Sequence, residues 1–257
     1  MKPLFFKFFI TFCVLLSFAG CKQERQAIAQ PQASQILIDS TLHPADSIDA
    51  FIQPYRSRLN AVLDAPLSYA PKHITKTEGQ WNTPMGNLMA DLLLDRANAV
   101  ARIRGEQIVD MALFNFGGIR SSISKGPVSE RTAYEIMPFE NGLIVVGMPG
   151  RAVKKMVGFL TTASRPHPVS GIEIILRADG SLKSARIQGQ PIDDERIYYV
   201  ATSDYLMGGG DRMDFFADRV SISDTGYKIR NAMVDYFKTI DTLKAETDNR
   251  FIQLDTL

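Results

Sequence analysis

From residue 83 onward the chain alternates between apolar segments and amphipathic segments, and this alternation restricts the folds that it can adopt. The apolar segments have the length and composition of strands, whereas the amphipathic ones repeat their apolar residues at three- and four-residue steps, as helices do. The expected strands are residues 109–114, 143–148, 172–176, 185–187, 197–201 and 251–254, and the expected helices are residues 83–101, 130–136, 150–160 and 224–240. This order predicts an α/β (mixed α+β) fold, a single domain with a mixed sheet flanked by helices.

The folded domain is expected to begin with a further helix near residue 46. Apolar residues recur at helical steps over residues 48–63, although Pro54 in their midst should start, kink or split that helix. The next helix has a clearer start, because Thr83 can cap it and Pro84 suits its first turn.

The N-terminal residues have the pattern of an export signal. A basic stretch, residues 1–7, precedes an apolar run, residues 8–18, that is too short to span a bilayer as a helix. Two small residues then lead to Cys21. Cleavage before Cys21 and acylation of its thiol would make the protein a bacterial lipoprotein, exported and anchored at the periplasmic face or the cell surface. An ordinary secretory signal with an incidental cysteine is the alternative.

Residues 21–45 are polar and are interpreted as a tether between the lipid anchor and the folded domain. Within them, residues 36–38 are apolar and could form a short strand. The expected organisation is therefore a signal peptide over residues 1–20, a tether over residues 21–45 and one domain over residues 46–257.

The charge balance argues against a nucleic acid polymer as a partner. The chain has 29 Lys and Arg side chains against 28 Asp and Glu. Loss of a leader that contains Lys2 and Lys7 would leave 27 (29 − 2) against 28. No stripe of basic residues appears, so any anionic ligand must be held locally by one or two arginines.

The segment from Asn115 to Arg120 joins a strand end, two glycines and an arginine. Gly117 and Gly118 follow the apolar run and let the backbone turn sharply and approach a ligand closely. Arg120 then offers five fixed donors that suit a phosphate group. A tight turn without a ligand is the alternative.

Two later segments, residues 137–141 and 203–211, carry groups that would complement such an anion site. The rings of Phe139 and Tyr205 could stack on a base, which contributes about 1–3 kcal/mol per base in single-strand systems. Asp211, after three glycines, could accept hydrogen bonds from a ribose diol. The alternatives are two core aromatics and an aspartate that bonds only its own turn.

These motifs resemble the C-terminal domain of the 5′-nucleotidase / UDP-sugar hydrolase family. The resemblance extends from Thr83 to about Phe216, and its motifs occur in order at residues 85–88, 115–120, 138–141 and 209–211. In the two-domain enzymes of that family, an N-terminal metallophosphatase domain carries two metal ions and performs hydrolysis. The C-terminal domain binds the nucleoside and helps to hold the phosphates.

The resemblance implies a role for each matching side chain. Phe139 and Tyr205 would sandwich the base, Asp211 would take the ribose hydroxyls and Arg120 would meet the anionic end. The two asparagines would make polar contacts around the base or the loop. The candidate substrate-binding residues are Asn115, Gly118, Arg120, Phe139, Asn141, Tyr205 and Asp211. The expected ligand is a nucleoside monophosphate or a molecule like a UDP-sugar.

The sequence lacks the residues of a catalytic metal centre. Its three histidines, His43, His73 and His167, are isolated, and its two cysteines, Cys13 and Cys21, both lie in the N-terminal region just described. We therefore expect no cofactor in this chain, with any divalent metals belonging to a separate metallophosphatase chain. The leading hypothesis is the nucleotide-binding half of a split hydrolase. A non-catalytic nucleotide-binding lipoprotein and a scaffold are the alternatives.

Two departures from the family pattern bear on the anion site. The family usually has an arginine shortly before the helix that opens near residue 85, and residues 77–82 contain none. After Asp211 the family continues with glycine and an aromatic residue, whereas here Arg212 follows. Arg212 could replace the missing cation or point into solvent.

Overall fold

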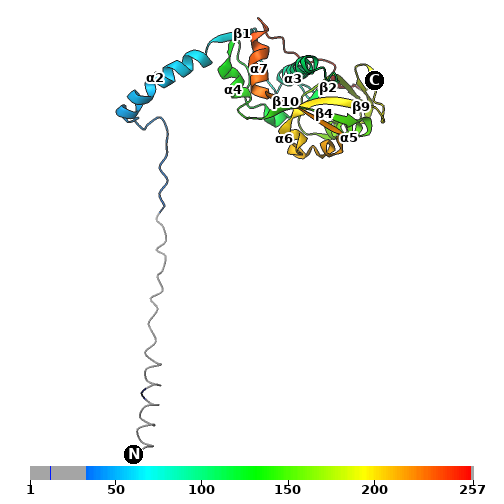
Figure 1. The fold of residues 1–257 in the computed structure, drawn as a ribbon, viewed down its shortest axis with the longest axis horizontal. Helices are drawn as coiled ribbons and strands as arrows, with labels where there is room; N and C mark the ends of the chain where they lie inside the picture. Colours follow the sequence, from blue (N-terminus) through cyan, green and yellow to red (C-terminus); the bar gives the residue numbers. More distant parts are fainter. Residues whose placement is uncertain (1–11, 13–32, 256–257) are drawn as a thin grey trace, which may run out of the picture. The chain divides into compact units, whose positions relative to one another are not determined.

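The computed structural model describes Phe12 and residues 33–255. Apart from Phe12, the predicted signal peptide lies outside the described residues, as do Cys21 and the first part of the predicted tether. The chain divides into two compact units between Asp49 and Ala50, and the second unit, Ala50–Leu257, is described by itself below (Figure 1).

The described helices and strands confirm a mixed α/β fold. The helices are α2 (Asp46–Leu63), α3 (Pro84–Arg104), α4 (Glu130–Ile136), α5 (Gly150–Thr162), α6 (Asp204–Met207) and α7 (Ile229–Lys238). The strands are β1 (Pro66–Ala70), β2 (Met111–Leu113), β3 (Gly126–Ser129), β4 (Gly142–Pro149), β5 (Val169–Ser170), β6 (Ile172–Leu176), β7 (Leu182–Ile187), β8 (Gln190–Pro191), β9 (Ile197–Ser203), β10 (Ser221–Lys228) and β11 (Phe251–Gln253). Short 3-10 turns, η1 (Phe116–Gly118), η2 (Gly210–Arg212) and η3 (Asp214–Asp218), occupy loops.

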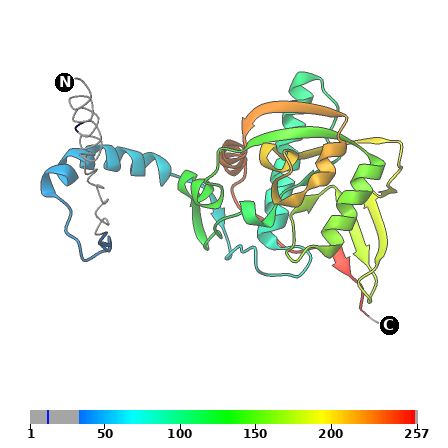
Figure 2. The same cartoon turned by 90° about the horizontal axis from the view of Figure 1, so that it is seen from below.

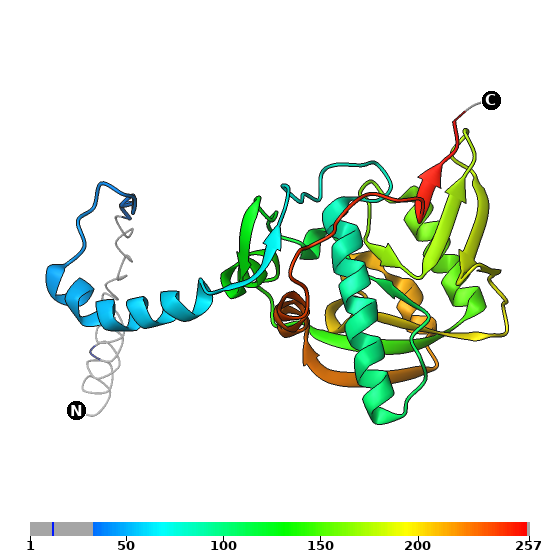
Figure 3. The ribbon, with the colours of Figure 1, turned by 90° about the horizontal axis from the view of Figure 1, so that it is seen from above.

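A five-stranded mixed sheet forms the centre of the domain, with the strand order β10-β4-β9-β2-β5. Strands β2 and β9 are parallel, whereas the other neighbours in this sheet run antiparallel. A four-stranded sheet, β11-β6-β7-β8, and a two-stranded pair, β1-β3, complete the fold. Helix α3 covers one face of the central sheet and α5 lies on the other face (Figures 2 and 3). The predicted arrangement of a mixed sheet flanked by helices is thus confirmed.

Helix α3 begins and ends where the sequence provides caps. The Thr83 hydroxyl accepts the N–H of Gly86 at 3.0 Å, and Pro84 occupies the first turn. The helix ends at Gly105, whose φ of 66° lies in the left-handed region that glycine tolerates. Its apolar stripe is buried against the sheet, which stabilises the helix through burial of apolar area.

The predicted helix over residues 224–240 is wrong in its first part. Residues 221–228 form β10, which pairs with β4, and the helix begins only at Ile229. Gly226 has a φ of 68°, which interrupts a right-handed helix. A bulge between Asp224 and Tyr227 absorbs that residue, and pairing with a buried strand outweighs local helix propensity.

In the segment that precedes the sheets, no described residue is buried. Residues 33–45 contain no helix or strand, so the possible strand at residues 36–38 does not form. Helix α2 forms as expected and includes Pro54, and none of its residues is buried. Pro54 therefore neither starts nor splits the helix.

Candidate functional site

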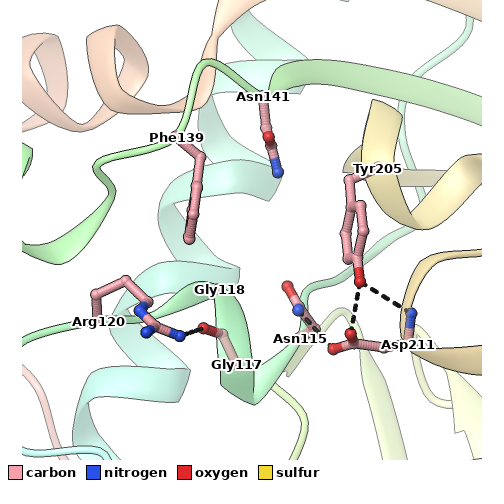
Figure 4. Close-up of a pocket in the computed structure, with 8 residues that line it drawn as sticks. All are labelled: Asn115, Gly117, Gly118, Arg120, Phe139, Asn141, Tyr205 and Asp211. Atoms are coloured by element: carbon pink, nitrogen blue, oxygen red, sulfur yellow. Dashed lines mark hydrogen bonds between the residues drawn. The ribbon is translucent and has the colours of Figure 1, made fainter. Parts of the chain in front are cut away.

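A cavity of about 320 Å³ gathers the side chains that the sequence singled out (Figure 4). Its volume falls at the lower end of the range of about 300–1,000 Å³ that is typical of small-molecule sites. It is lined by Asn115, Gly117, Gly118, Arg120, Phe139, Asn141, Tyr205 and Asp211. All seven candidate residues therefore line one pocket, together with Gly117.

The sheet explains why segments so far apart in sequence meet here. Parallel strands β2 and β9 end at the same edge, and β4 begins there because Leu143 pairs with Ser203. The loop after β2 supplies Asn115 to Arg120, the loop before β4 supplies Phe139 and Asn141, and α6 and η2 follow β9. The pocket thus lies outside the carboxyl ends of β2 and β9, a common place for ligand sites in α/β sheets.

Phe139 and Tyr205 stand on opposite sides of the pocket and leave a space between their rings (Figure 4). Large aromatic side chains are usually buried, yet Phe139 is 42% exposed and Tyr205 is 48% exposed. Asn141 points into the same space between the two rings (Figure 4). Two open aromatic faces and one amide suit a flat, polar-edged molecule.

Asp211 is held in place by two neighbouring side chains. Asn115 Nδ2 donates to Asp211 Oδ2 at 2.6 Å, and the Tyr205 hydroxyl donates to Asp211 Oδ1 at 2.8 Å. This hydrogen bond to Asp211 raises the pKa of the Tyr205 phenol, which therefore stays protonated. A carboxylate has about four acceptor sites, so Asp211 can still accept bonds from a ligand.

The backbone at Asp211 adopts a conformation that L-residues rarely take. Its φ is 53°, and that of the following Arg212 is 61°. Asp tolerates this region better than most residues, and strained backbone of this kind concentrates at ligand sites. Arg212 is exposed and does not line the pocket.

Gly118 is needed because its neighbours leave no room for a side chain. A Cβ at this position would lie 2.5 Å from Asn115 Oδ1 and 2.7 Å from the Phe114 ring. At Gly117 a Cβ would meet only ordinary contacts, 3.6 Å from Asn115 Nδ2 and 3.7 Å from Asp211 Oδ2. Close packing therefore requires glycine at position 118 but not at position 117.

Arg120 lies at the pocket with its guanidinium exposed. Its Nη1 donates to the carbonyl of Gly117 at 3.2 Å, and its guanidinium carbon lies 5.9 Å from the centre of the Phe139 ring. It forms no ion pair with the residues that the structure describes. Its remaining donors are therefore available to an anion.

Helix α7 fixes the loop that carries Phe139, a role that the sequence did not reveal. Buried Arg230 donates to the carbonyl of Phe139 at 3.3 Å, pairs with Glu140 and lies over the Tyr134 ring at 4.2 Å. The N–H of Ile229 also donates to the carbonyl of Asn141, at 3.0 Å. A lone arginine in an amphipathic helix gives no signal of such a contact.

His167, one of the three histidines that are isolated in the sequence, packs against the loop that carries the two glycines. Its Nδ1 accepts the N–H of Phe116 at 3.4 Å, and its ring packs against Phe159 at 5.6 Å. Burial lowers the pKa of His167, and Asp211 opposes this shift. The bond to Nδ1 requires the neutral ring.

The structure also brings two unexpected cations beside the pocket. Lys76 Nζ lies 4.3 Å from the centre of the Phe116 ring, and the Arg165 guanidinium carbon lies 5.5 Å from it. Phe116 directly precedes the pocket-lining Gly117. Neither cation belongs to a motif, so the sequence offered no sign of them.

Over Phe12 and residues 33–255, no three His, Cys, Asp or Glu side chains gather closely enough to hold a metal ion. Within the same residues, no helix is long and apolar enough to cross a membrane.

The structure is an α/β domain with a pocket at the carboxyl ends of β2 and β9. A family model described as 5′-nucleotidase, C-terminal domain, matches residues 66–218. This match covers more than half of the 257 residues, and the chain belongs to that family.

Two curated relatives extend the comparison. Protein UshA of Escherichia coli (strain K12) is 28% identical over 152 residues, which are 56% of this chain and 25% of UshA. The trifunctional nucleotide phosphoesterase protein YfkN of Bacillus subtilis (strain 168) is 27% identical over 195 residues, 70% of this chain and 12% of YfkN. The chain thus spans a quarter or less of the length of these relatives.

Among solved structures, the 5′-nucleotidase precursor from Thermus thermophilus has the same fold. It aligns with a TM-score of 0.66 at 24% identity, over 82% of this chain and 43% of that chain. This likeness shows that the two proteins share a fold.

Proposed function

We propose that this chain is the nucleotide-binding part of a 5′-nucleotidase-type phosphohydrolase that acts in nucleotide catabolism or scavenging. The observation that carries the proposal is a pocket in which two exposed rings face each other across a space. The base would lie between Phe139 and Tyr205, the ribose hydroxyls would bond to Asp211, and the phosphate end would reach Arg120.

Hydrolysis would require a separate metallophosphatase chain that supplies the divalent metals. Among relatives, the names of YfkN and of the Thermus thermophilus protein denote phosphoesterase and nucleotidase activities, and both proteins are much longer than the matched region. The histidines of this chain are too few and too scattered to supply such a centre themselves.

We also propose that the protein is exported and anchored to a membrane through acylated Cys21. The motivation is the basic and apolar pattern of residues 1–18 followed by a cysteine. Metabolic labelling with a palmitate analogue tests this proposal. Label that is absent from a Cys21→Ser variant supports it, whereas equal label on both proteins contradicts it.

The test of hydrolysis combines the protein with a candidate metallophosphatase encoded beside its gene. We expect nucleoside monophosphate turnover to rise when both chains are present with a divalent metal. Phe139→Ala in this chain should reduce the rise, and Arg102→Ala, a change of an exposed side chain on α3, should preserve it. No gain in turnover with any such partner would contradict the split-enzyme proposal.

A second candidate function is nucleotide capture without catalysis. The pocket favours it, because the two rings, the carboxylate and the arginine proposed to hold a nucleotide all line the same cavity. In that case nucleosides bind to the protein alone, and no partner raises turnover.

A further inference from the structure

Helix α2 carries a row of large apolar side chains that the described residues leave open to solvent. Five of these side chains are between 37% and 68% exposed: Ile48, Ile52, Tyr55, Leu59 and Val62. We call this row the seam. Folded proteins rarely expose a contiguous apolar patch of this kind, and such a patch is typical of an interaction surface.

The spacing of the seam is that of a coiled coil. Its residues follow one another at steps of four, three, four and three, which is the alternation of the two core positions in a seven-residue repeat. The opposite side of the helix carries small or polar residues, as at Ala50 and Ser57. A pattern of this kind favours packing against another helix.

The domain holds α2 from the side that faces away from the seam. Arg131 of α4 donates to Asn60 Oδ1 at 2.8 Å, and to the two carboxylate oxygens of Asp64 at 2.5 Å and 3.2 Å. In the seven-residue repeat, Asn60 and Asp64 both fall on the polar side of the helix. The contact with α4 therefore fixes the end of the helix and leaves the seam uncovered.

A second copy of the same helix fits the seam when the two helices run antiparallel. Ile48 of one copy then faces Leu59 of the other, and Ile52 faces Tyr55. The two-fold symmetry of such a pair repeats both contacts. Every layer between residues 48 and 59 is thereby filled with large apolar side chains, and no polar side chain of the repeat is buried.

The residues that flank the seam favour the same direction. Asp49 and Arg56 lie on one flank, and in the antiparallel pair Asp49 of one copy faces Arg56 of the other. Phe51 and Arg58 lie on the other flank and meet in the same way, as a ring and a guanidinium that attract each other. A parallel pair would not bring Asp49 to Arg56. Flanking charges of this kind set the partner and the direction of coiled coils.

A lipid surface suits α2 less well. Helices that lie on membranes usually carry an excess of Lys and Arg on their polar face. In α2 the two basic residues, Arg56 and Arg58, are balanced by Asp46 and Asp49. The charge pattern therefore favours a second copy of the helix over a membrane.

We propose that α2 is a self-association surface, through which two copies of this protein form an antiparallel two-helix dimer. The occupant of the seam is a second copy of this chain. This inference goes beyond the proposed function and does not depend on it, because no pocket-lining residue lies on α2.

Analytical ultracentrifugation tests the dimer. The protein is produced without residues 1–20 and with Cys21→Ser, so that neither a lipid nor a disulfide links two copies. We expect an equilibrium between monomer and dimer that shifts toward dimer with concentration. Leu59→Lys places a charge within the seam and should weaken association at least about tenfold. Ala61→Lys adds the same charge to an exposed position away from the seam and should leave association unchanged.

Charge reversal tests the direction of the helices. Asp49→Arg sets like charges against each other in the antiparallel pair and should weaken association severalfold. Addition of Arg56→Asp to that variant should restore native association, because the opposite charges then face each other again. Circular dichroism checks that each variant keeps its helices.

Three results would overturn the proposal. The first is a native protein that remains monomeric up to about 100 μM. The second is a dimer that Leu59→Lys and Ala61→Lys affect equally, since the seam would then not be its interface. The third is a monomer that binds vesicles of phosphatidylethanolamine and phosphatidylglycerol and loses this binding with Leu59→Lys, which would assign the seam to a membrane. A dimer that Asp49→Arg does not weaken would contradict the antiparallel arrangement.

Discussion

At the scale of single residues, Tyr205 combines two functions that substitutions can separate. Its ring faces the pocket and its hydroxyl donates to Asp211 at 2.8 Å. Tyr205→Phe keeps the ring and loses the hydrogen bond, so we expect nucleoside affinity to fall severalfold. Tyr205→Ala loses both and should cost about 1–3 kcal/mol of binding free energy, the usual contribution of one stacked base. Calorimetry measures the nucleoside affinity of both variants, and an equal loss of affinity in the two would show that the ring does not stack.

Alanine substitutions at the two glycines of the loop after β2 form a matched pair that tests how tightly this loop is packed. Gly118→Ala places a Cβ against Asn115 and the Phe114 ring, so Asn115 must shift and release Asp211. We expect a loss of about 1–3 kcal/mol in the free energy of unfolding, together with weaker ligand binding. Gly117→Ala meets only ordinary contacts and should change stability by less than about 1 kcal/mol. Chemical denaturation measures both variants, and equal effects would contradict this packing account.

His167 should make stability depend on pH in a defined direction. Its pKa in the folded protein is lowered from an ordinary value of 6.5 by burial, so the unfolded chain binds a proton more readily. The contribution of His167 to the free energy of unfolding is therefore fully present above about pH 6.5. It is lost as the pH falls below that value toward the pKa of His167 in the folded protein. Thermal unfolding from pH 5 to pH 8 should show this loss in the native protein.

His167→Gln removes the titrating ring and should flatten the pH dependence below pH 6.5. His43→Gln changes an exposed histidine outside the domain and is the matched control. The same slope in the native protein and in the His167 variant would contradict the assignment of the slope to His167.

At the scale of elements, helix α7 and the loop of Phe139 form one unit. Arg230 is buried and bridges the helix to Glu140 and to the carbonyl of Phe139. Arg230→Met leaves these partners unmatched, and we expect a loss of about 2–4 kcal/mol in the free energy of unfolding and a displaced Phe139. Glu140→Gln keeps Arg230 and a hydrogen-bond acceptor, so its effect should be smaller.

Nucleoside affinity distinguishes this positioning role from general destabilisation. In conditions where the Arg230→Met protein remains folded by circular dichroism, we expect its affinity to fall at least about fivefold, because the ring no longer faces Tyr205. Native affinity in a destabilised variant would show that Arg230 supports the fold and not the pocket.

The sequence predicted elements well where periodicity and caps agree. Helix α3 begins at its predicted cap, and α4 and β6 have their predicted bounds. The prediction failed at β10, where local residues favour a helix and pairing with β4 decides the outcome. The possible strand at residues 36–38 does not form, because an apolar run becomes a strand only when it pairs with another strand.

The pocket was predictable because its residues follow strand ends, where an α/β fold gathers loops. Asn115, Phe139 and Asp211 each belong to a local motif that can be read along the chain. Arg230 and His167 act through contacts across 91 and 51 residues, and no local pattern marks such pairs. The sequence therefore predicted the lining of the pocket and missed the residues that hold it in place.

At the scale of the whole molecule, the domain carries a complete pocket and, over its described residues, no cluster of metal ligands. In the proposed function, this chain binds the nucleotide and a partner chain supplies hydrolysis, so binding can be measured on the isolated protein.

The most direct measurement is calorimetric titration of the protein with nucleosides and nucleotides, repeated with the double variant Phe139→Ala, Tyr205→Ala. Both rings are exposed, so the variant should keep its fold, which circular dichroism checks. The account predicts one bound nucleotide per chain in the native protein and at least about a hundredfold weaker binding in the variant. Equal affinity of a folded variant, or no binding by the native protein, would contradict the claim that the two rings hold a base.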